Sequence, residues 1–534
     1  MTGRVVGLRK ISLALIVAAA GTAAIALAIA VPSSRGAHRV VTANGTLTVG
    51  IEADVREVDN ILASISVDKL IMGSTVYDPL LTSDKNGNAL PALAVKATPS
   101  KNLLTWTFSL RKGVHFTDGK LFTAKDVKQN FDAFVDPKNA SDFAGDLSNL
   151  ASTQVVNQYT VAFHLKKPDS RFTSVVQDTM FIADLGARGG ATLLKPGATP
   201  IGTGPYKWAG RSPGNSITFV SNPGYWRGKP PLQKVVFKVM SDPQIAALAV
   251  QNGDVDAVVN DIAPQSIGQL QSNKNLRVLK TTGSTIYQAY FNFEKARRGA
   301  YKKPMDVRLG LSYLLDTSRI IPKLIGAFGT LATQPLPPWE PGYNPQIKPV
   351  PYNVSLGESL LAAGGIPKGG TINILVFDRP FTCEWGTAMQ AKLKSLGYNA
   401  TLDCEEPEVA PAKITQYQWD ILVARTSGRP TAAVMFDDRW SLSIATPPDD
   451  FYTLHDQKLQ NIINRMHATV DAKKYAALGR DAETRIMKAD VAMVAGYWDN
   501  DYIVANKKVS GLVASPLIYV PFLYNGITKV SVKG

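Results

Sequence analysis

The sequence has few of the residues on which catalytic and metal sites depend. Among 534 residues there are five histidines and two cysteines. No two histidines stand at the spacing of a zinc site, and the phosphate-binding pattern G-x-x-x-x-G-K-[ST] is missing. We therefore expect no catalytic residues, no metal and no cofactor, and we predict that the protein is not an enzyme. The histidines are His38, His115, His164, His455 and His467.

Two short patterns imitate catalytic motifs. Gly210 to Gly214 fits G-x-S-x-G, but a nucleophile elbow leads into a helix, whereas this segment leads into the strand pattern of Ile217 to Val220. We interpret it as a hairpin turn. Asp254 and Asp256 could be paired carboxylates, but their place between a helix and a strand favours a structural role.

Basic residues outnumber acidic ones, with 58 lysines and arginines against 43 aspartates and glutamates and a formal charge of +15. The basic residues are scattered and no recognised nucleic-acid motif accompanies them, so we expect a diffuse positive surface and no nucleic-acid partner. At 45% hydrophobic content the chain can bury several domain-sized cores. We expect a monomer.

Long hydrophobic runs are confined to the N-terminus. Arg4, Arg9 and Lys10 precede the uncharged stretch from Ile11 to Val31, after which no comparable run follows, so the chain is not a permease. Residues 1–40 are predicted to be a cleaved signal peptide or an uncleaved membrane anchor, and both alternatives stay open. Either one places the rest of the chain outside the cytoplasmic membrane, at the cell surface or in a periplasm. Lipidation is excluded, because the first cysteine is Cys383.

The expected location outside the cytoplasm bears on the two cysteines. Cys383 and Cys404 are the only pair, and an oxidising environment favours a disulfide between them. The residues between them predict a helix that is stopped by Gly397 and followed by a strand. A disulfide would join the helix start to the strand end, while two free buried thiols are the alternative.

Residues 104–135 contain a strand, a glycine turn and a helix in a specific order. Apolar and polar residues alternate from Leu104 to Leu110, Asp118-Gly119 marks a turn, and Thr123 is a candidate N-cap whose hydroxyl would accept an amide hydrogen. Helical spacing of apolar residues begins at Ala124. The segment resembles the hallmark of the family 5 solute-binding proteins, the peptide- and nickel-type receptors of ABC importers.

Further segments resemble other motifs of the same family, in the family's order. They are Tyr77–Leu81 with Asn88–Ala94, Gly202–Tyr206 (GTGPY), Asn222–Pro230, Val250–Asp256 and Asp306–Asp316. The chain also alternates between short apolar strands, such as Thr46 to Ile51 and Ile372 to Val376, and segments of helical spacing, such as Gln244 to Gln251 and Leu459 to Thr469.

The resemblance implies an α/β fold of the two-lobed periplasmic-binding-protein type (type II, cluster C). Lobe one would take residues 45–285, with an extra hairpin-rich subdomain at about 75–200, and the return at 495–534, while lobe two would take 286–494. By the same resemblance, the protein is a bacterial receptor that captures a peptide or other small polar solute between the lobes. It would deliver that solute to the permease and ATPase subunits of an importer. The alternative is a surface-anchored sensing or interaction protein that keeps the fold without uptake.

The expected ligand site departs from the peptide-binding members of the family. Where those members carry an aspartate that receives the peptide's ammonium group, this chain reads Val423 to Pro430 (VARTSGRP). Arginines there suit carboxylate or phosphate, so we expect an anion-accepting site, although each arginine could instead pair with a nearby acid such as Asp437, Asp438 or Glu384. Aromatic residues and family positions complete the expected ligand-binding set. The set is Arg379, Trp385, Arg425, Ser427, Arg429, Trp440, Asn292, Tyr290 and Thr203.

Overall fold

A computed structural model describes residues 45–63, 66–83, 89–141, 143–259, 262–378, 381–406, 409–426, 431–442, 454–514 and 526–533. Residues Val41–Gly534 form one compact unit, and the expected N-terminal signal or anchor lies outside the described residues. No helix in the described ranges is long and apolar enough to cross a membrane.

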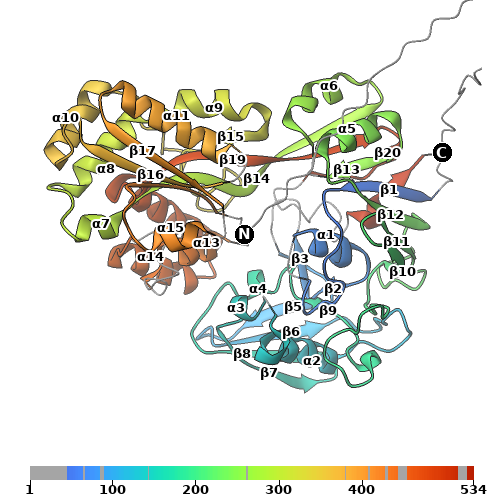
Figure 1. Ribbon diagram of the computed structural model, residues 1–534. Coiled ribbons are helices and arrows are strands. Elements are labelled where there is room, and N and C mark those ends of the chain that lie inside the picture. Colours follow the sequence, from blue (N-terminus) through green and yellow to red (C-terminus); the bar gives the residue numbers. More distant parts are fainter. Residues whose placement is uncertain are drawn as a thin grey trace, which may run out of the picture. The chain divides into compact units, whose positions relative to one another are not determined.

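An eleven-stranded mixed sheet is the central element of the fold (Figure 1). Its main path runs β10-β11-β12-β1-β13-β19-β14-β18-β16-β17, and β15 pairs with β19 beside that path. The strands are β10 (Tyr206–Ser212), β11 (Ser216–Ser221), β12 (Lys234–Val239), β1 (Thr46–Ile51), β13 (Ala257–Val259), β19 (Met493–Asn506), β14 (Leu276–Phe291), β18 (Ile421–Thr426), β16 (Thr371–Phe377), β17 (Asn399–Glu405) and β15 (Gly329–Leu331).

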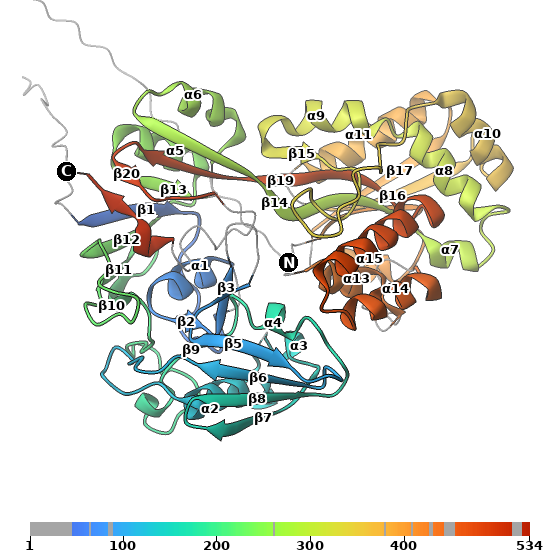
Figure 2. The same ribbon diagram turned by 180° about the vertical axis from the view of Figure 1, so that it is seen from behind.

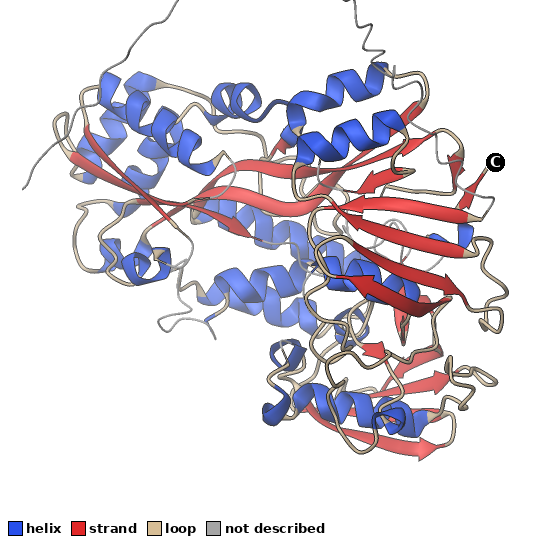
Figure 3. Ribbon diagram, turned by 45° about the vertical axis from the view of Figure 1, so that its right-hand side comes forward, coloured by secondary structure: helices blue, strands red, loops and turns tan. Residues whose placement is uncertain are grey.

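Two strands, β14 and β19, are much longer than the others and run antiparallel side by side. Figure 3 shows helices on either side of this long pair. The antiparallel pairing runs from Leu276↔Asn506 to Tyr290↔Met493, and its register shifts between Thr282 and Ile286. β14 and β19 therefore carry the chain from one end of the sheet to the other in both directions.

A separate four-stranded antiparallel sheet holds the segment that was expected as an inserted subdomain (Figure 2). Its order is β5 (Ala94–Pro99), β6 (Thr105–Leu110), β8 (Thr160–Leu165) and β7 (Leu150–Asn157). Helix α2 (Ala124–Val135) packs on this sheet, and Phe131 and Phe163 meet with ring centroids 4.6 Å apart. Thr123 is the N-cap of α2, as predicted, and forms a capping box with Asp126, whose carboxylate accepts from the Thr123 N–H at 2.8 Å and from the Thr123 hydroxyl at 2.9 Å.

The remaining helices lie around the two sheets, and the helices that begin at Phe143 and Phe172 pack in the apolar cluster of the four-stranded sheet. They are α1 (Ser66–Thr75), α3 (Phe143–Asp146), α4 (Phe172–Val175), α5 (Pro243–Asn252), α6 (Ile267–Ser272), α7 (Phe293–Arg297), α8 (Pro304–Leu314), α9 (Thr317–Ile325), α10 (Val354–Gly364), α11 (Thr382–Ser395), α12 (Ala410–Ile414), α13 (Ala432–Trp440), α14 (Gln457–His467) and α15 (Ala472–Thr484). Short strands complete the list as β2 (Asp78–Pro79), β3 (Leu81–Ser83), β4 (Ala89–Pro91), β9 (Phe181–Ile182), β20 (Val509–Ser510) and β21 (Ser531–Val532).

Several predicted elements are confirmed. The strand predicted from Thr46 is β1, the helix predicted from Gln244 lies within α5, and the helix predicted from Leu459 lies mostly within α14. The G-x-S-x-G segment is the turn between the antiparallel strands β10 and β11, as predicted. Asp256 has a structural role, since its carboxylate accepts from the Thr48 backbone N–H at 2.8 Å and pairs with Lys508.

Different hydrophobic clusters pack against the two ends of the long strands β14 and β19. Three clusters of buried apolar residues draw on residues 47–276 and 502–530, and two others draw on residues 286–498. Between these sets lie Lys280–Thr285 (KTTGST) of β14 and Asp499–Asp501 (DND) of β19, which we call the polar crossing. We call the two sets of residues lobe one and lobe two. The sequence-derived lobe boundaries at 285/286 and 494/495 stay a prediction.

Candidate functional site

The polar crossing gathers acidic groups at the point where the two cores separate. Asp499 and Asp501 are two residues apart on β19 and therefore project from the same face of the strand. Both carboxylates converge on Gly283 of β14, because a Cβ atom built there would lie 2.3 Å from Asp499 Oδ1 and 2.7 Å from Asp501 Oδ2. A glycine at this position leaves room for the two acids.

Charges from two further elements act on this acidic pair. Burial raises the pKa of Asp501 well above its usual range, and the charges of Asp499 and of Glu52, which follows β1, raise it further. Arg425 of β18 is exposed, and its guanidinium acts to lower the pKa values of both Glu52 and Asp499. We call Glu52, Arg425, Asp499 and Asp501 the charged quartet.

Burial dominates the titration of the quartet's carboxyls. It raises the pKa of Asp499 to about 7, against hydrogen bonds from Thr285 and the attraction of Arg425. It also raises the pKa of Glu52, again against Arg425. The quartet holds three carboxyls and one guanidinium, so a cationic group placed among the carboxyls would stabilise their ionised forms.

The arginine-rich segment is only partly described. Arg425 is in register with Tyr287 of β14, which is itself in register with Tyr497 of β19. Arg379, Ser427 and Arg429 lie outside the described residues. Their place in an anion-accepting site stays a prediction.

Helix α13 follows the arginine-rich segment, and the first backbone N–H groups of this helix donate hydrogen bonds to side chains of the protein. Glu340 Oε1 accepts from the Ala432 N–H at 2.9 Å, Tyr475 Oη accepts from the Ala433 N–H at 2.9 Å, and Thr431 accepts from the next amide. Burial raises the pKa of Glu340 to about 8. The start of this helix therefore offers little to an external anion.

A hollow with room for about one water molecule lies between α13 and the polar crossing. Trp339 closes one side and donates from Nε1 to the Thr282 carbonyl at 3.0 Å. The lining residues are Ser284, Leu336, Pro337, Trp339, Glu340, Thr431, Ala432 and Met435.

Four residues that the sequence placed among the ligand contacts are buried in structural positions. Trp385 and Trp440 are core residues of lobe two. The Tyr290 hydroxyl lies 2.8 Å from Thr426 Oγ1, and Asn292 donates to the Tyr417 and Trp419 carbonyls at 3.1 and 2.8 Å. These contacts account for the polar groups of Tyr290 and Asn292 without a ligand. A ligand role for the four residues stays a prediction.

Thr203 belongs to a buried network that is remote in sequence from the crossing. Its hydroxyl donates to Asp78 at 2.8 Å, and the same carboxylate accepts from Tyr225 Oη at 3.0 Å and Trp226 Nε1 at 2.9 Å. Gly204 leaves no space for a side chain, because a Cβ atom there would lie 2.3 Å from the Thr75 carbonyl oxygen. This network joins the GTGPY segment and the Asn222–Pro230 segment to β2.

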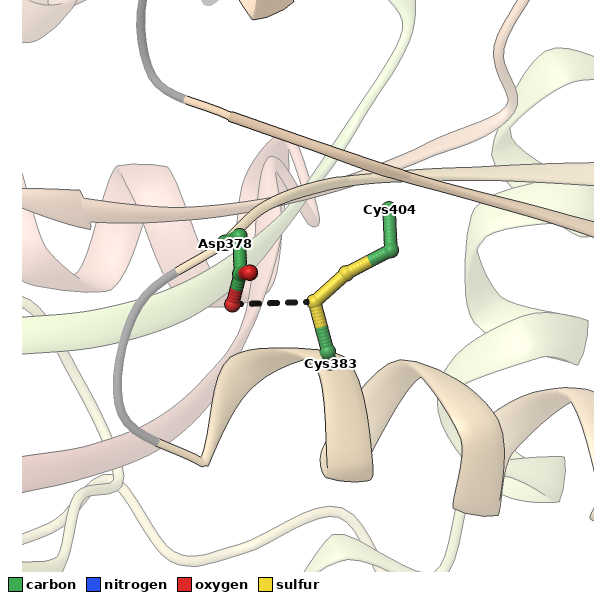
Figure 4. A group of neighbouring side chains, drawn as sticks. All are labelled: Asp378, Cys383 and Cys404. Carbon is green, nitrogen blue, oxygen red and sulfur yellow. Dashed lines mark hydrogen bonds between the residues drawn. A yellow bond between two sulfur atoms is a disulfide. The ribbon is translucent and has the colours of Figure 1, made fainter. Parts of the chain in front are cut away.

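Cys383 and Cys404 form a disulfide with their Cα atoms 5.9 Å apart (Figure 4). It joins the first turn of α11 to β17, and Gly397 ends the intervening helical segment at a positive φ of 88°. The Asp378 carboxylate lies 3.3 Å from Cys383 Sγ. The three side chains are close enough to hold a metal ion, but two sulfurs bonded to each other offer no thiolate.

Sequence reasoning missed the acidic members of the quartet. Asp499 and Asp501 interrupt an otherwise apolar strand, and Glu52 ends the apolar run of β1. Charges at those places were a usable signal. Their meeting with Arg425 depends on the sheet order, which brings β14, β18 and β19 together and is not visible in a linear reading.

Curated relatives of the chain bind small solutes. Heme-binding protein A of Haemophilus influenzae is 30% identical over 320 residues, which cover 55% of this chain and 57% of that protein. The dipeptide-binding protein of Escherichia coli K12 is 24% identical over 508 residues, covering 84% of this chain and 90% of that protein. The match to heme-binding protein A thus spans little more than half of that relative.

Solved structures share the fold. HbpA2 from Haemophilus parasuis superposes with a TM-score of 0.81 at 22% identity, covering 92% of this chain and 100% of that chain. DppA from Helicobacter pylori, in complex with the peptide STSA, superposes with a TM-score of 0.72 at 22% identity, covering 92% and 98%. The fold is therefore the two-lobed α/β fold of the periplasmic binding proteins.

The family model described as bacterial extracellular solute-binding proteins, family 5 Middle, matches residues 88–444. That range contains most of the motifs on which the resemblance rested, together with the crossing strand β14 and Arg425. The chain belongs to the family 5 bacterial extracellular solute-binding proteins.

Proposed function

We propose that the protein is the extracytoplasmic substrate-binding component of an ABC importer. It captures a peptide or peptide-like solute and delivers it to a membrane permease that a separate ATPase drives. Its family membership and its similarity to a dipeptide-binding protein along 90% of that protein support this function. Residues 1–40 then act as a signal peptide or membrane anchor.

The observation that carries the proposal is the charged quartet at the polar crossing. A receptor of this fold binds solutes where its two lobes meet, and the quartet takes one member from the residue that follows β1, one from β18 and two from β19. Carboxylates accept from an ammonium group, while a guanidinium donates to a carboxylate. The chemistry of the quartet therefore fits a solute that carries both charges.

This proposal extends the anion-accepting site that the sequence predicts. Arg425 keeps its role as the donor to a carboxylate, whereas Asp499 and Asp501 accept hydrogen bonds from a cationic group. The acid that peptide-binding relatives carry in the segment after β18 is thereby replaced by acids on β19. Free peptides remain suitable ligands.

Mass spectrometry of small molecules released from natively purified protein would identify the solute class. Calorimetry would then compare Met-Leu, which is bound in one structural neighbour, with its N-acetylated and C-amidated forms. We expect the unmodified dipeptide to bind most tightly. Equal affinity for all three forms would contradict the assignment of the quartet.

Two substitutions test recognition of the dipeptide's carboxylate and of its ammonium group separately. Arg425→Gln should weaken binding of the unmodified dipeptide by about 10- to 100-fold and leave the C-amidated form nearly unchanged. Asp501→Asn should weaken binding of the unmodified dipeptide but leave binding of its N-acetylated form nearly unchanged. Arg480→Gln, on the exposed side of α15, is the matched control and should bind like the parent.

A further inference from the structure

A second charged cluster joins the subdomain of the four-stranded sheet to lobe two. Asp169, Ser170 and Arg171 precede α4, whose Phe172 belongs to the apolar cluster of that subdomain. Asp437 lies on α13 and His467 ends α14, both in lobe two. We call these five residues the interlobe clasp.

The clasp is held by backbone and side-chain contacts. The Ser170 N–H donates to the His467 carbonyl at 2.7 Å, and its hydroxyl donates to the Met466 carbonyl at 3.2 Å. Ser170 thus satisfies the His467 carbonyl at the end of α14 and is a further donor to the Met466 carbonyl, which also accepts from the Ala468 and Thr469 amides. Residues nearly 300 positions apart are joined in this way.

Around this contact the charged groups alternate in sign. His467 lies between two carboxylates, with Nε2 2.5 Å from Asp437 Oδ2 and Nδ1 3.7 Å from Asp169 Oδ1. Arg171 bridges the same two carboxylates, at 3.3 Å from Asp169 and 3.4 Å from Asp437. With a protonated His467 two cations face two anions, whereas with a neutral His467 one carboxylate charge is left uncompensated.

The surroundings of His467 favour its charged form. Burial alone would lower the pKa of His467, but the neighbouring carboxylates of Asp169 and Asp437 outweigh both burial and the repulsion of Arg171 and raise it. Its position at the end of α14 adds the favourable field of a helix C-terminus. The pKa of Asp169 is lowered by His467 and Arg171 against the effect of burial, so Asp169 stays ionised in weak acid.

We propose that the interlobe clasp is a proton-dependent device that holds the two lobes together and weakens when His467 loses its proton. Separation of the lobes must break the bonds of Ser170 and expose His467 to water. The clasp is at full strength below the ordinary histidine pKa of about 6.5, and it is lost as the pH rises through the raised pKa of the closed form. Closure is thus favoured by mild acidity whatever solute the receptor carries.

Hydrogen exchange of the Ser170 amide tests the clasp directly in the ligand-free full chain. After correction for intrinsic exchange, its protection factor reports the ratio of closed to open clasp. We expect protection at pH 6 to exceed that at pH 8 by at least about fivefold. Small-angle scattering should show a smaller radius of gyration at pH 6.

His467→Gln should abolish both pH effects, because glutamine can fill the site but carries no charge. Asp437→Asn, a second variant that keeps the shape of the side chain, should reduce them in the same way. His115→Gln, an exposed histidine of the same subdomain, is the control and should keep the parent behaviour.

Equal protection of Ser170 at both pH values in the parent would overturn the proposal, as would an unchanged pH effect in His467→Gln and Asp437→Asn. Because no ligand is added, these results are independent of the calorimetry on the charged quartet. Failure of the clasp would therefore leave the proposed function untouched.

Discussion

Single polar residues supply the hydrogen bonds that buried polar groups of this chain need. Thr203 was expected near the ligand from its glycine-rich motif, yet its hydroxyl is one of three donors to the buried Asp78 carboxylate. Burial raises the pKa of Asp78, against those donors and Arg227. The loss of one donor leaves a buried acceptor short of a partner.

Thr203→Val should lower the free energy of unfolding by about 1–3 kcal/mol, because it removes that donor without changing the side-chain volume much. Urea denaturation followed by circular dichroism would measure the loss. Thr98→Val on the exposed face of β5 is the matched control and should change stability little. If both variants were equally stable, the Asp78 network would not contribute as the structure indicates.

Glu340 links stability to pH, because burial raises its pKa in the folded state to about 8, against about 4.3 in an unfolded chain. A group with a raised folded pKa contributes stability that is complete below its unfolded pKa and is lost as the pH rises through its folded pKa. Glu340→Gln keeps an acceptor for the Ala432 N–H but cannot titrate.

Between pH 5 and 7.5, the parent should therefore lose stability relative to Glu340→Gln by roughly 1.4 kcal/mol per pH unit. Denaturation midpoints at several pH values would reveal the trend. Glu406→Gln at an exposed position should instead run parallel to the parent. A constant difference between parent and Glu340→Gln would refute the raised pKa.

At the scale of elements, the crossing strands combine regular pairing with a polar interruption. β14 pairs with β19 on both sides of residues 283–285, where the register shifts. The sequence KTTGST resembles an ordinary polar loop, but the ladder on either side keeps it within one long strand. Gly283 is required there by the carboxylates it faces.

Gly283→Ala should destabilise the protein by about 1–3 kcal/mol, because the new methyl group would overlap Asp499 and Asp501 and force both to move. It should also weaken dipeptide binding. Gly268→Ala in α6 meets no neighbouring atom and should be neutral or stabilising by up to about 1 kcal/mol. Thermal unfolding of the two variants side by side would decide, and similar melting temperatures would contradict this reading of Gly283.

At the scale of the whole molecule, the division of the core defines where the chain can bend. Apolar packing holds residues 47–276 with 502–530, and separately holds residues 286–498. The polar crossing lies between these sets. Little hydrophobic free energy is lost when the lobes move about that point.

Hydrogen exchange should accordingly be faster in residues 280–285 and 499–501 than in the flanking residues 286–291 and 502–506, although all lie in β14 or β19. Mass spectrometry of peptic fragments can measure both sets in one experiment, with the flanks as the internal reference. Uniform protection along the two strands would argue against bending at the polar crossing.

The sequence by itself determined the family, the fold class and many of the elements. Its motifs and periodicities depend on neighbouring residues, such as the alternation in β6 or the helical spacing that ends at Gly397. Its cysteine pair also pointed to the disulfide that the structure contains. The motifs and periodicities are local, and two cysteines allow only one disulfide pairing. Both can therefore be recovered from the sequence.

Only the tertiary structure decided what the charged and aromatic residues do. Trp385 and Trp440 pack in cores and Thr203 serves Asp78, while Asp499 and Asp501 emerged as neighbours of Glu52 and Arg425. The clasp between Ser170 and His467 likewise joins distant segments. Such meetings depend on strand order and on the packing of one lobe against the other, and neither leaves a periodic trace in the sequence.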